Sequence, residues 1–139
     1  MAKWAIMADF SIRSPDRPGE LARLAATMQV AGVSLVALWG YGEGQDRARF
    51  YCVPEHPEHF RDFARSSNLE VEEGKTFYLT GADQPGALVA WLDKIGSAGI
   101  NLQGIEAVRI HGVFGVFIWA DSKDWYTLTQ LLTLDPDPG

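Results

Sequence analysis

The chain contains an internal repeat. Residues 10–42 align without gaps on residues 77–109, and beyond the next loop residues 50–53 fall on residues 116–119. The identical pairs of the first block are Phe10/Phe77, Asp16/Asp83, Pro18/Pro85, Gly19/Gly86, Leu21/Leu88, Ala31/Ala98, Gly32/Gly99 and Leu35/Leu102. Two units of about 65 residues are too few for a solenoid, which needs at least three repeats. The repeat therefore predicts two copies of one small fold.

Each copy is expected to begin with a strand, a turn and a helix. Short β-prone runs at residues 10–12 and 77–79 end in the turn sequences SPDRPG and GADQPG. The helices that follow carry apolar residues at i, i+3, i+4 and i+7 spacing, which predicts one buried stripe per helix. The stripes are Leu21, Leu24, Ala25 and Met28 in the first copy, and Leu88, Trp91, Leu92 and Ile95 in the second. Gly32 and Gly99 are expected to end these helices, because glycine adopts the left-handed C′ conformation without steric cost.

A hairpin and a second helix are expected to follow in each copy. The elements predicted are strands at residues 33–39, 49–53, 69–73, 100–108 and 113–119 and helices at residues 57–66 and 123–132. Residues 40–44 are interpreted as a hairpin turn that continues through Gln45 and Asp46, and Gly74 and Lys75 as a tight turn between the copies. The order β-α-β-β-α-β is that of the ferredoxin-like split unit. We therefore expect an α+β fold of two tandem ferredoxin-like units, with antiparallel sheets and with helices on one face.

The predicted boundary separates residues 1–74 from residues 75–139. After the last predicted helix only TLDPDPG remains. Its two prolines indicate that the closing strand of the second unit is short or missing, which would leave a bare sheet edge. Residues 3–7 extend the first strand beyond what one unit needs. We expect them to cover such an edge, in the same chain or in another one.

Charge and composition exclude several classes of partner. The net charge of −6 opposes binding to phosphate backbones, so nucleic acid is not an expected partner. No apolar run approaches the ~20 residues that span a bilayer, and Asp9 interrupts the N-terminal stretch too early for a signal peptide. The single cysteine, Cys52, excludes an intrachain disulfide and is typical of a reducing compartment. We therefore expect a cytoplasmic protein with no membrane partner.

A turn motif that occurs twice carries a family resemblance. The pattern D-x-P-G-x-L lies on each predicted strand-to-helix turn, and thirteen residues after its glycine comes G-[VI]-[SN]-L at a strand start. On these motifs the chain resembles the ACT domain, as two tandem copies that cover nearly its whole length. The resemblance implies a non-catalytic regulatory protein that binds a free amino acid where two ACT units meet.

The resemblance places this ligand between the first turn of one unit and the second strand of another. The residues implied are Asp16, Arg17, Pro18, Gly19, Glu20, Leu21, Ser34, Asp83, Gln84, Pro85, Gly86, Ala87, Leu88 and Asn101. A helix N-terminus favours the same place, because its free N–H groups and partial positive charge attract a carboxylate. The ligand's ammonium group needs an acceptor, which is Asp16 or Asp83. Ser34 or Asn101 from a facing unit supplies a neutral partner, and Asp83 with Asn101 is the favoured pair.

Structural roles compete with binding at several of these positions. Asp16 and Asp83 are as well suited to capping the helices as to holding a ligand, and the two roles are compatible. For Gly32 and Gly99 a C-cap is favoured over a ligand contact.

The segment CVPEHPEH invites a metal interpretation, because thiolate, imidazole and carboxylate are all metal ligands. Pro57, however, breaks the geometry that would align His56 and His59, and Cys52 is expected on a strand as a small apolar residue. We interpret the segment as a helix entry with a charged first turn. The sequence also lacks a nucleophile elbow, a phosphate loop and an H-E-x-x-H motif. We therefore expect no enzymatic activity, no metal and no cofactor.

Three functions remain open at this point. The leading hypothesis is a regulatory protein that senses an amino acid and signals through its assembly or through a partner enzyme of amino-acid metabolism. The second is a constitutive dimerisation subunit of an amino-acid biosynthetic enzyme, without a ligand of its own. The third is a small enzyme or metal binder on a ferredoxin-like scaffold. A homodimer is expected, because two-fold pairing covers exposed sheet edges.

Overall fold

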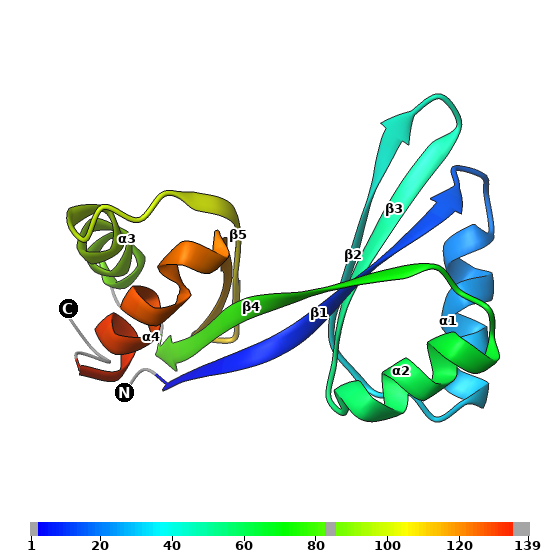
Figure 1. Ribbon diagram of the computed structural model, residues 1–139, viewed down its shortest axis with the longest axis horizontal. Helices are drawn as coiled ribbons and strands as arrows, with labels where there is room; N and C mark the ends of the chain where they lie inside the picture. Colours follow the sequence, from blue (N-terminus) through cyan, green and yellow to red (C-terminus); the bar gives the residue numbers. More distant parts are fainter. Residues whose placement is uncertain (1–2, 83–85, 135–139) are drawn as a thin grey trace. The chain divides into compact units, whose positions relative to one another are not determined.

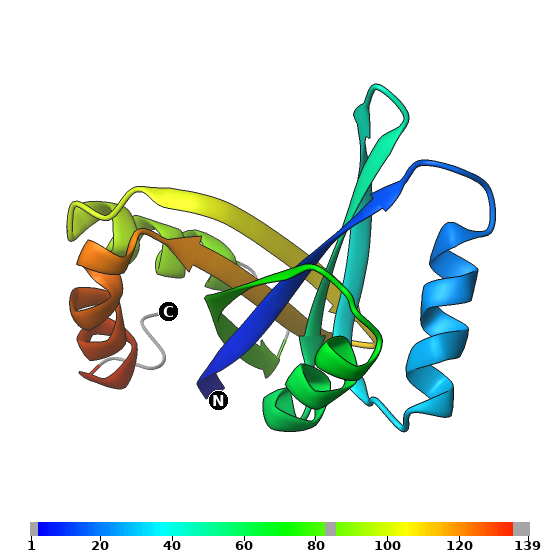
Figure 2. The same ribbon diagram turned by 45° about the vertical axis from the view of Figure 1, so that its right-hand side comes forward.

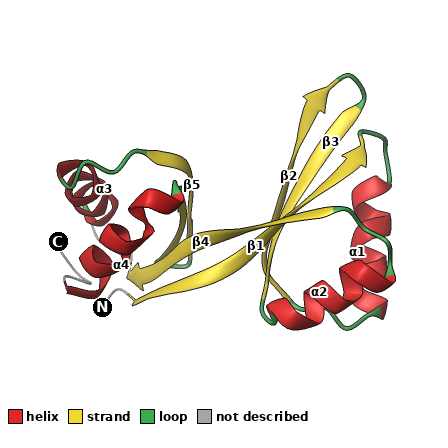
Figure 3. Cartoon of the chain, viewed as in Figure 1, coloured by secondary structure: helices red, strands yellow, loops and turns green. Residues whose placement is uncertain are grey.

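The computed structural model describes residues 3–82 and 86–134. Strands and helices follow one another as an α+β fold (Figures 1 and 3). The elements are β1 (Lys3–Pro15), α1 (Glu20–Val30), β2 (Leu35–Gly44), β3 (Arg47–Pro54), α2 (Pro57–Ser66), β4 (Val71–Ala82), α3 (Ala87–Ser97), β5 (Leu102–Ile110), β6 (Val113–Ala120), the 3₁₀ turn η1 (Ser122–Asp124) and α4 (Trp125–Leu134). The strands are hydrogen-bonded in the order β2-β3-β1-β4-β6-β5.

The chain forms two compact units, which are described separately. The N-unit is Ala8–Gly74, and the C-unit combines residues 1–7 with residues 75–139. Both β1 and β4 cross the boundary, so each gives one end to each unit. The strand order is therefore β2-β3-β1-β4 in the N-unit and β5-β6-β4-β1 in the C-unit. Residues 3–7 thus supply the fourth strand of the C-unit from the same chain.

The N-unit builds its core between the strands and two helices. Strand β1 pairs antiparallel with β3, with Phe10 opposite Cys52, and β2 pairs antiparallel with β3. Helices α1 and α2 lie on the same side of strands β1–β3 (Figure 2). The buried cluster that they enclose comprises Phe10, Ile12, Leu24, Met28, Ala48, Phe50, Cys52, Phe60, Phe63 and Ala64. Phe60 and Phe63 of α2 are buried in this cluster.

The C-unit repeats this arrangement. Strand β4 pairs antiparallel with β6, with Phe77 opposite Ile118, which is the pair equivalent to Phe10 and Cys52. Its buried cluster comprises Phe77, Leu79, Trp91, Ile95, Ile100, Phe114, Val116, Ile118, Ala120, Leu128 and Leu132. Trp4 of β1 packs against this cluster. The N-terminal strand therefore adds apolar surface to the C-unit as well as backbone.

The repeated glycines adopt equivalent conformations in the two units. Gly19 and Gly86, the N-caps of α1 and α3, have φ of 89° and 80°. Gly32 and Gly99, just beyond the same helices, have φ of 73° and 77°. Left-handed backbone is strained for residues that carry a Cβ, which explains why all four positions are glycine. The prediction that Gly32 and Gly99 end the helices is confirmed.

The tight turn predicted at Gly74 and Lys75 is wrong, because β4 runs without interruption from Val71 to Ala82. Gly74 is needed for another reason. A Cβ at this position would lie 2.8 Å from Asp9 Oδ1, so glycine allows close approach of the buried Asp9 side chain.

The hairpin turn predicted at residues 40–46 is shorter than expected, although it is correctly placed at its end. Strand β2 continues to Gly44, and the turn consists of Gln45 and Asp46, with φ of 55° and 59°. These values are typical of a two-residue type I′ hairpin turn. Gly40 belongs to the strand interior, where a Cβ would lie 2.5 Å from Phe50 Cδ1.

The predicted stripe on α1 is only half buried. Leu24 and Met28 are in the core, whereas Leu21 is 40% exposed and Ala25 is exposed. In α3, Trp91 and Ile95 are buried.

Among the described residues, no helix is long and apolar enough to cross a membrane.

Candidate functional site

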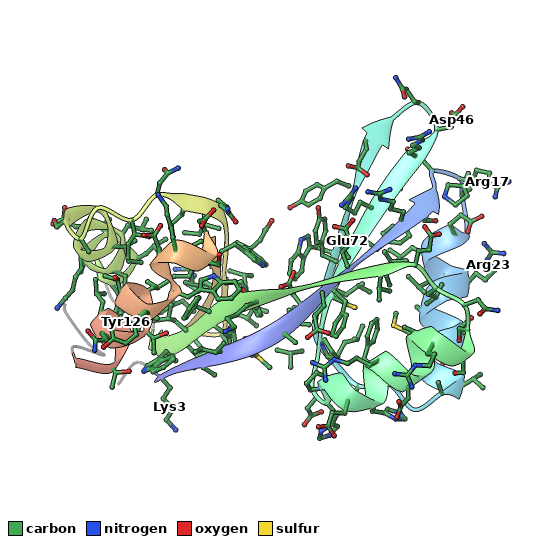
Figure 4. All side chains as sticks on the ribbon, in the orientation of Figure 1. Lys3, Arg17, Arg23, Asp46, Glu72 and Tyr126 are labelled. Carbon is green, nitrogen blue, oxygen red and sulfur yellow. The ribbon has the colours of Figure 1, made fainter. Side chains whose placement is uncertain are left out.

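The first turn of the motif is organised by Gly19 and by a charged cluster. Gly19 is the N-cap of α1, and no described side chain caps this helix end by a hydrogen bond. Arg17 donates a 3.1 Å hydrogen bond to Glu20 Oε1, and Arg23 donates to Glu20 Oε2. The Glu20 side chain is only 12% exposed, against 65% for Arg17 and 71% for Arg23. Figure 4 shows both arginines beside the start of α1. The Glu20 carboxylate is therefore largely withdrawn from solvent beneath two exposed guanidinium groups.

Asp16 does not cap α1, so the capping role expected for it is wrong. Its backbone N–H donates to the carbonyl oxygen of Asp46 over 2.8 Å. A Cβ on Gly42 would lie 3.0 Å from Asp16 Oδ2, so the carboxylate faces the β2–β3 hairpin rather than the helix. The physical reason is that Gly19, in left-handed conformation, takes the N-cap position three residues later.

In the second turn, Asp83, Gln84 and Pro85 lie outside the described residues. Gly86 is the N-cap of α3, and the first turn of this helix has no acidic residue among those described. Ala87 and Leu88 pack against the core of the C-unit. The two turns therefore differ at the residue after glycine, where Glu20 corresponds to Ala87.

Ser34 and Asn101 precede β2 and β5 and are both exposed. The Ser34 carbonyl oxygen accepts a 2.8 Å hydrogen bond from the Glu55 N–H. Helix α1 has 11 residues, or about 16 Å at 1.5 Å per residue, and separates Ser34 from the first turn. Within one unit, the structure therefore does not bring the turn and Ser34 together.

A hollow that the sequence did not reveal lies beside the first turn, within the N-unit. Its volume is about 340 Å³. It is lined by Ile12, Arg13, Ser14, Pro15, Glu20, Arg23, Leu24, Thr27, Phe50, Ser67 and Leu69. We call it the α1 groove. The one sequence signal related to it is the i, i+3 spacing of Glu20 and Arg23, which places the two charges side by side on the helix surface.

A second charged cluster lies across strands β1 and β3. Arg13 and Arg49 are directly opposite each other. Arg49 donates a 3.2 Å hydrogen bond to Glu43, which raises the pKa of the guanidinium. Glu72 lies 3.4 Å from Arg13 and 4.0 Å from Arg49. Because the two arginines already face two carboxylates, this cluster has little net attraction for an anion.

The segment considered for a metal has structural roles instead. Cys52 is fully buried, and burial, followed by the charge of Asp9, raises the pKa of its thiol to about 12. His59 Nε2 donates to the Ala31 carbonyl oxygen over 2.9 Å and so satisfies the C-terminal end of α1. Across residues 3–82 and 86–134, no group of three potential ligand side chains lies together.

Solved structures share this fold over nearly their whole length. A protein from Bacteroides thetaiotaomicron superposes with a TM-score of 0.83 and 16% identity, covering 97% of this chain and 92% of that one. The regulatory subunit of aspartate kinase from Thermus thermophilus superposes with a TM-score of 0.66 and 12% identity, covering 96% and 95%. The equivalent subunit from Thermus flavus gives 0.63 and 12%, covering 98% and 97%.

No protein-family model and no curated protein sequence matches the chain. At these low identities the structural likeness concerns the fold. The chain has the fold of aspartate kinase regulatory subunits, which confirms its resemblance to the ACT domain.

Proposed function

We propose that this chain is a non-catalytic regulatory protein built of two tandem ferredoxin-like ACT units, and that it binds a free amino acid. The observation that carries the proposal is the correspondence, over almost the full length of both chains, with regulatory subunits of aspartate kinase. Two left-handed glycines at the starts of α1 and α3 support it, because each leaves the helix N-terminus without a side chain.

The proposed ligand sites are the two turns, residues 16–21 and 83–88, each acting with Ser34 or Asn101 of a facing unit. Binding is expected to change the assembly of the protein or its contact with an enzyme of amino-acid metabolism. A homodimer is part of the proposal, since β2 and β5 are the edges of the strand order and two-fold pairing covers such edges.

The decisive experiment is calorimetric titration of the whole chain with each of the twenty amino acids, followed by a series of divalent metals. Saturable binding of one or a few amino acids supports the proposal. If no amino acid binds at millimolar concentration, the regulatory ligand is not an amino acid and the proposal fails.

A matched pair of glycine variants tests the second turn. Gly86→Val places a branched side chain over the start of α3, and Gly112→Val creates the same backbone strain in the β5–β6 turn. The two positions have φ of 80° and 77°, and no described atom lies within 4 Å of an added Cβ at either. We expect Gly86→Val alone to weaken amino-acid binding. Equal affinity in both folded variants would contradict the location.

A further inference from the structure

The α1 groove combines an apolar floor with a charged rim. Ile12, Leu24 and Phe50 line it and belong to the buried cluster of the N-unit, with exposed fractions of 2%, 9% and 8%. Glu20 and Arg23 line the same groove from the first turns of α1, and Arg13 lines it from β1. Its volume of about 340 Å³ is near the lower limit of small-molecule pockets, which hold about 300–1,000 Å³. The groove therefore suits a compact ligand with an apolar body and a polar head.

The two rim charges differ in how they are held. Glu20 is 12% exposed and Arg23 is 71% exposed, although the two form an ion pair. The carboxylate is kept in place by a second partner, Arg17, whereas the Arg23 guanidinium extends into solvent. Each carboxylate oxygen has more than one lone pair, and a guanidinium has five N–H donors. Both groups therefore have hydrogen-bonding capacity left for a ligand.

A cation and an anion side by side above an apolar floor are complementary to a zwitterion. An ammonium group would bind the Glu20 carboxylate, and a carboxylate would bind the Arg23 guanidinium. A side chain attached between them would lie toward Leu24 and Phe50. A lysine side chain would lose hydration on that floor and would face the positive charges of Arg13 and Arg23, so lysine is disfavoured.

We propose that the α1 groove binds a free α-amino acid with an aliphatic side chain, through Glu20 and Arg23. This site lies wholly within the N-unit, needs no facing unit and is additional to the two turn sites proposed above. The inference deepens the proposed function and rests on it for the class of ligand. Since α3 has Ala87 where α1 has Glu20, the C-unit lacks the acidic half of this rim among its described residues, and only one such site per chain is expected.

The test is calorimetric titration with leucine and valine, compared with lysine. Leucine methyl ester, which lacks the carboxylate, and 4-methylpentanoate, which lacks the ammonium group, probe the two charges separately. The variants are Glu20→Gln and Arg23→Gln, with thermal unfolding as a check on the fold. Arg65→Gln is the matched control, because Arg65 forms an equally spaced but largely exposed pair with Asp62 on α2. Thr27→Phe fills the groove and leaves both charges intact.

We expect leucine to bind the α1 groove with one site per chain, and both analogues to bind there at least about tenfold more weakly, which is the effect of losing one charged hydrogen bond. Glu20→Gln, Arg23→Gln and Thr27→Phe should weaken leucine binding to a similar extent, and Arg65→Gln should not change it. Leucine binding that survives all three groove variants would overturn the groove site and leave the proposed function standing. Failure of every amino acid to bind the unmodified chain would overturn both.

Discussion

Gly40 offers a sharp test of the packing in the N-unit. In the structure it lies in the interior of β2, directly opposite Phe50 of β3. A Cβ on Gly40 would lie 2.5 Å from Phe50 Cδ1, 3.0 Å from Cε1 and 3.4 Å from the Arg49 carbonyl oxygen. Normal carbon–carbon contacts are about 3.5–4.0 Å, so in Gly40→Ala the ring must move by about 1 Å. Phe50 is 8% exposed and belongs to the buried cluster, so the core has to rearrange with it.

Two effects of opposite sign set the magnitude. Overpacking of a well-filled core costs about 1–3 kcal/mol. Replacing glycine reduces the conformational freedom of the unfolded chain, which stabilises by about 0.4–1 kcal/mol. The clash is the larger of the two, and the midpoints of the two ranges, about 2 and about 0.7 kcal/mol, differ by about 1.3 kcal/mol. We therefore expect Gly40→Ala to lower the free energy of unfolding by about 1 kcal/mol or more.

The assay is urea unfolding at 25 °C, followed by tryptophan fluorescence. Gly96→Ala is the matched control, because Gly96 lies in α3 and an added Cβ there meets no described atom within 4 Å. The same chemical change should stabilise the chain there by up to about 1 kcal/mol. In a Phe50→Leu background, where the ring is absent, Gly40→Ala should cost less than in the unmodified chain, with a coupling of at least about 0.5 kcal/mol.

A neutral or stabilising Gly40→Ala would refute this reasoning. That is the result expected if Gly40 lay in an open hairpin turn, as its sequence alone suggests. A cost that stays the same in the Phe50→Leu background would show that the ring is not the cause.

Three further predictions concern protonation and the N-terminal strand. Hydrogen bonds from Arg61, over 2.8 and 2.7 Å, lower the pKa of Glu73. The ionised Glu73 therefore stabilises the folded chain above the unfolded pKa of about 4.3, and this stabilisation is lost as the pH falls through the folded pKa. Glu73→Gln should therefore destabilise the chain at pH 7 and lose this effect near pH 3, as measured by urea unfolding at both pH values; an equal cost at both would contradict the assignment. Because the pKa of Cys52 is raised to about 12, iodoacetamide at pH 8 should modify this thiol only in urea, and rapid labelling of the folded chain would disprove its burial. Deleting residues 2–7 removes Trp4 from the core of the C-unit and should lower the melting temperature, whereas an unchanged melting temperature would show that this strand is dispensable.

The sequence by itself determined the features that depend on local backbone chemistry. The repeat, the left-handed glycines Gly32 and Gly99, and the bounds of α2 all follow from residues close together in the chain. Glycine at positive φ and proline at the start of a helix have strong preferences that hold in most surroundings. For the same reason, the paired turn motif was enough to indicate the ACT fold.

The tertiary structure decided whatever depends on a partner distant in sequence. Gly40 and Gly74 have the local character of turn residues, yet each lies in a strand. Glycine is needed there because a side chain from another strand, Phe50 or Asp9, occupies the space that a Cβ would fill. The exposure of Leu21 and the burial of the Glu20 carboxylate beneath two arginines also depend on how α1 packs against the rest of the N-unit. Residues 3–7 join the C-unit because β1 is long enough to serve both units. A sequence pattern records which residues can be buried, but which atoms meet is set only when the strands and helices pack together.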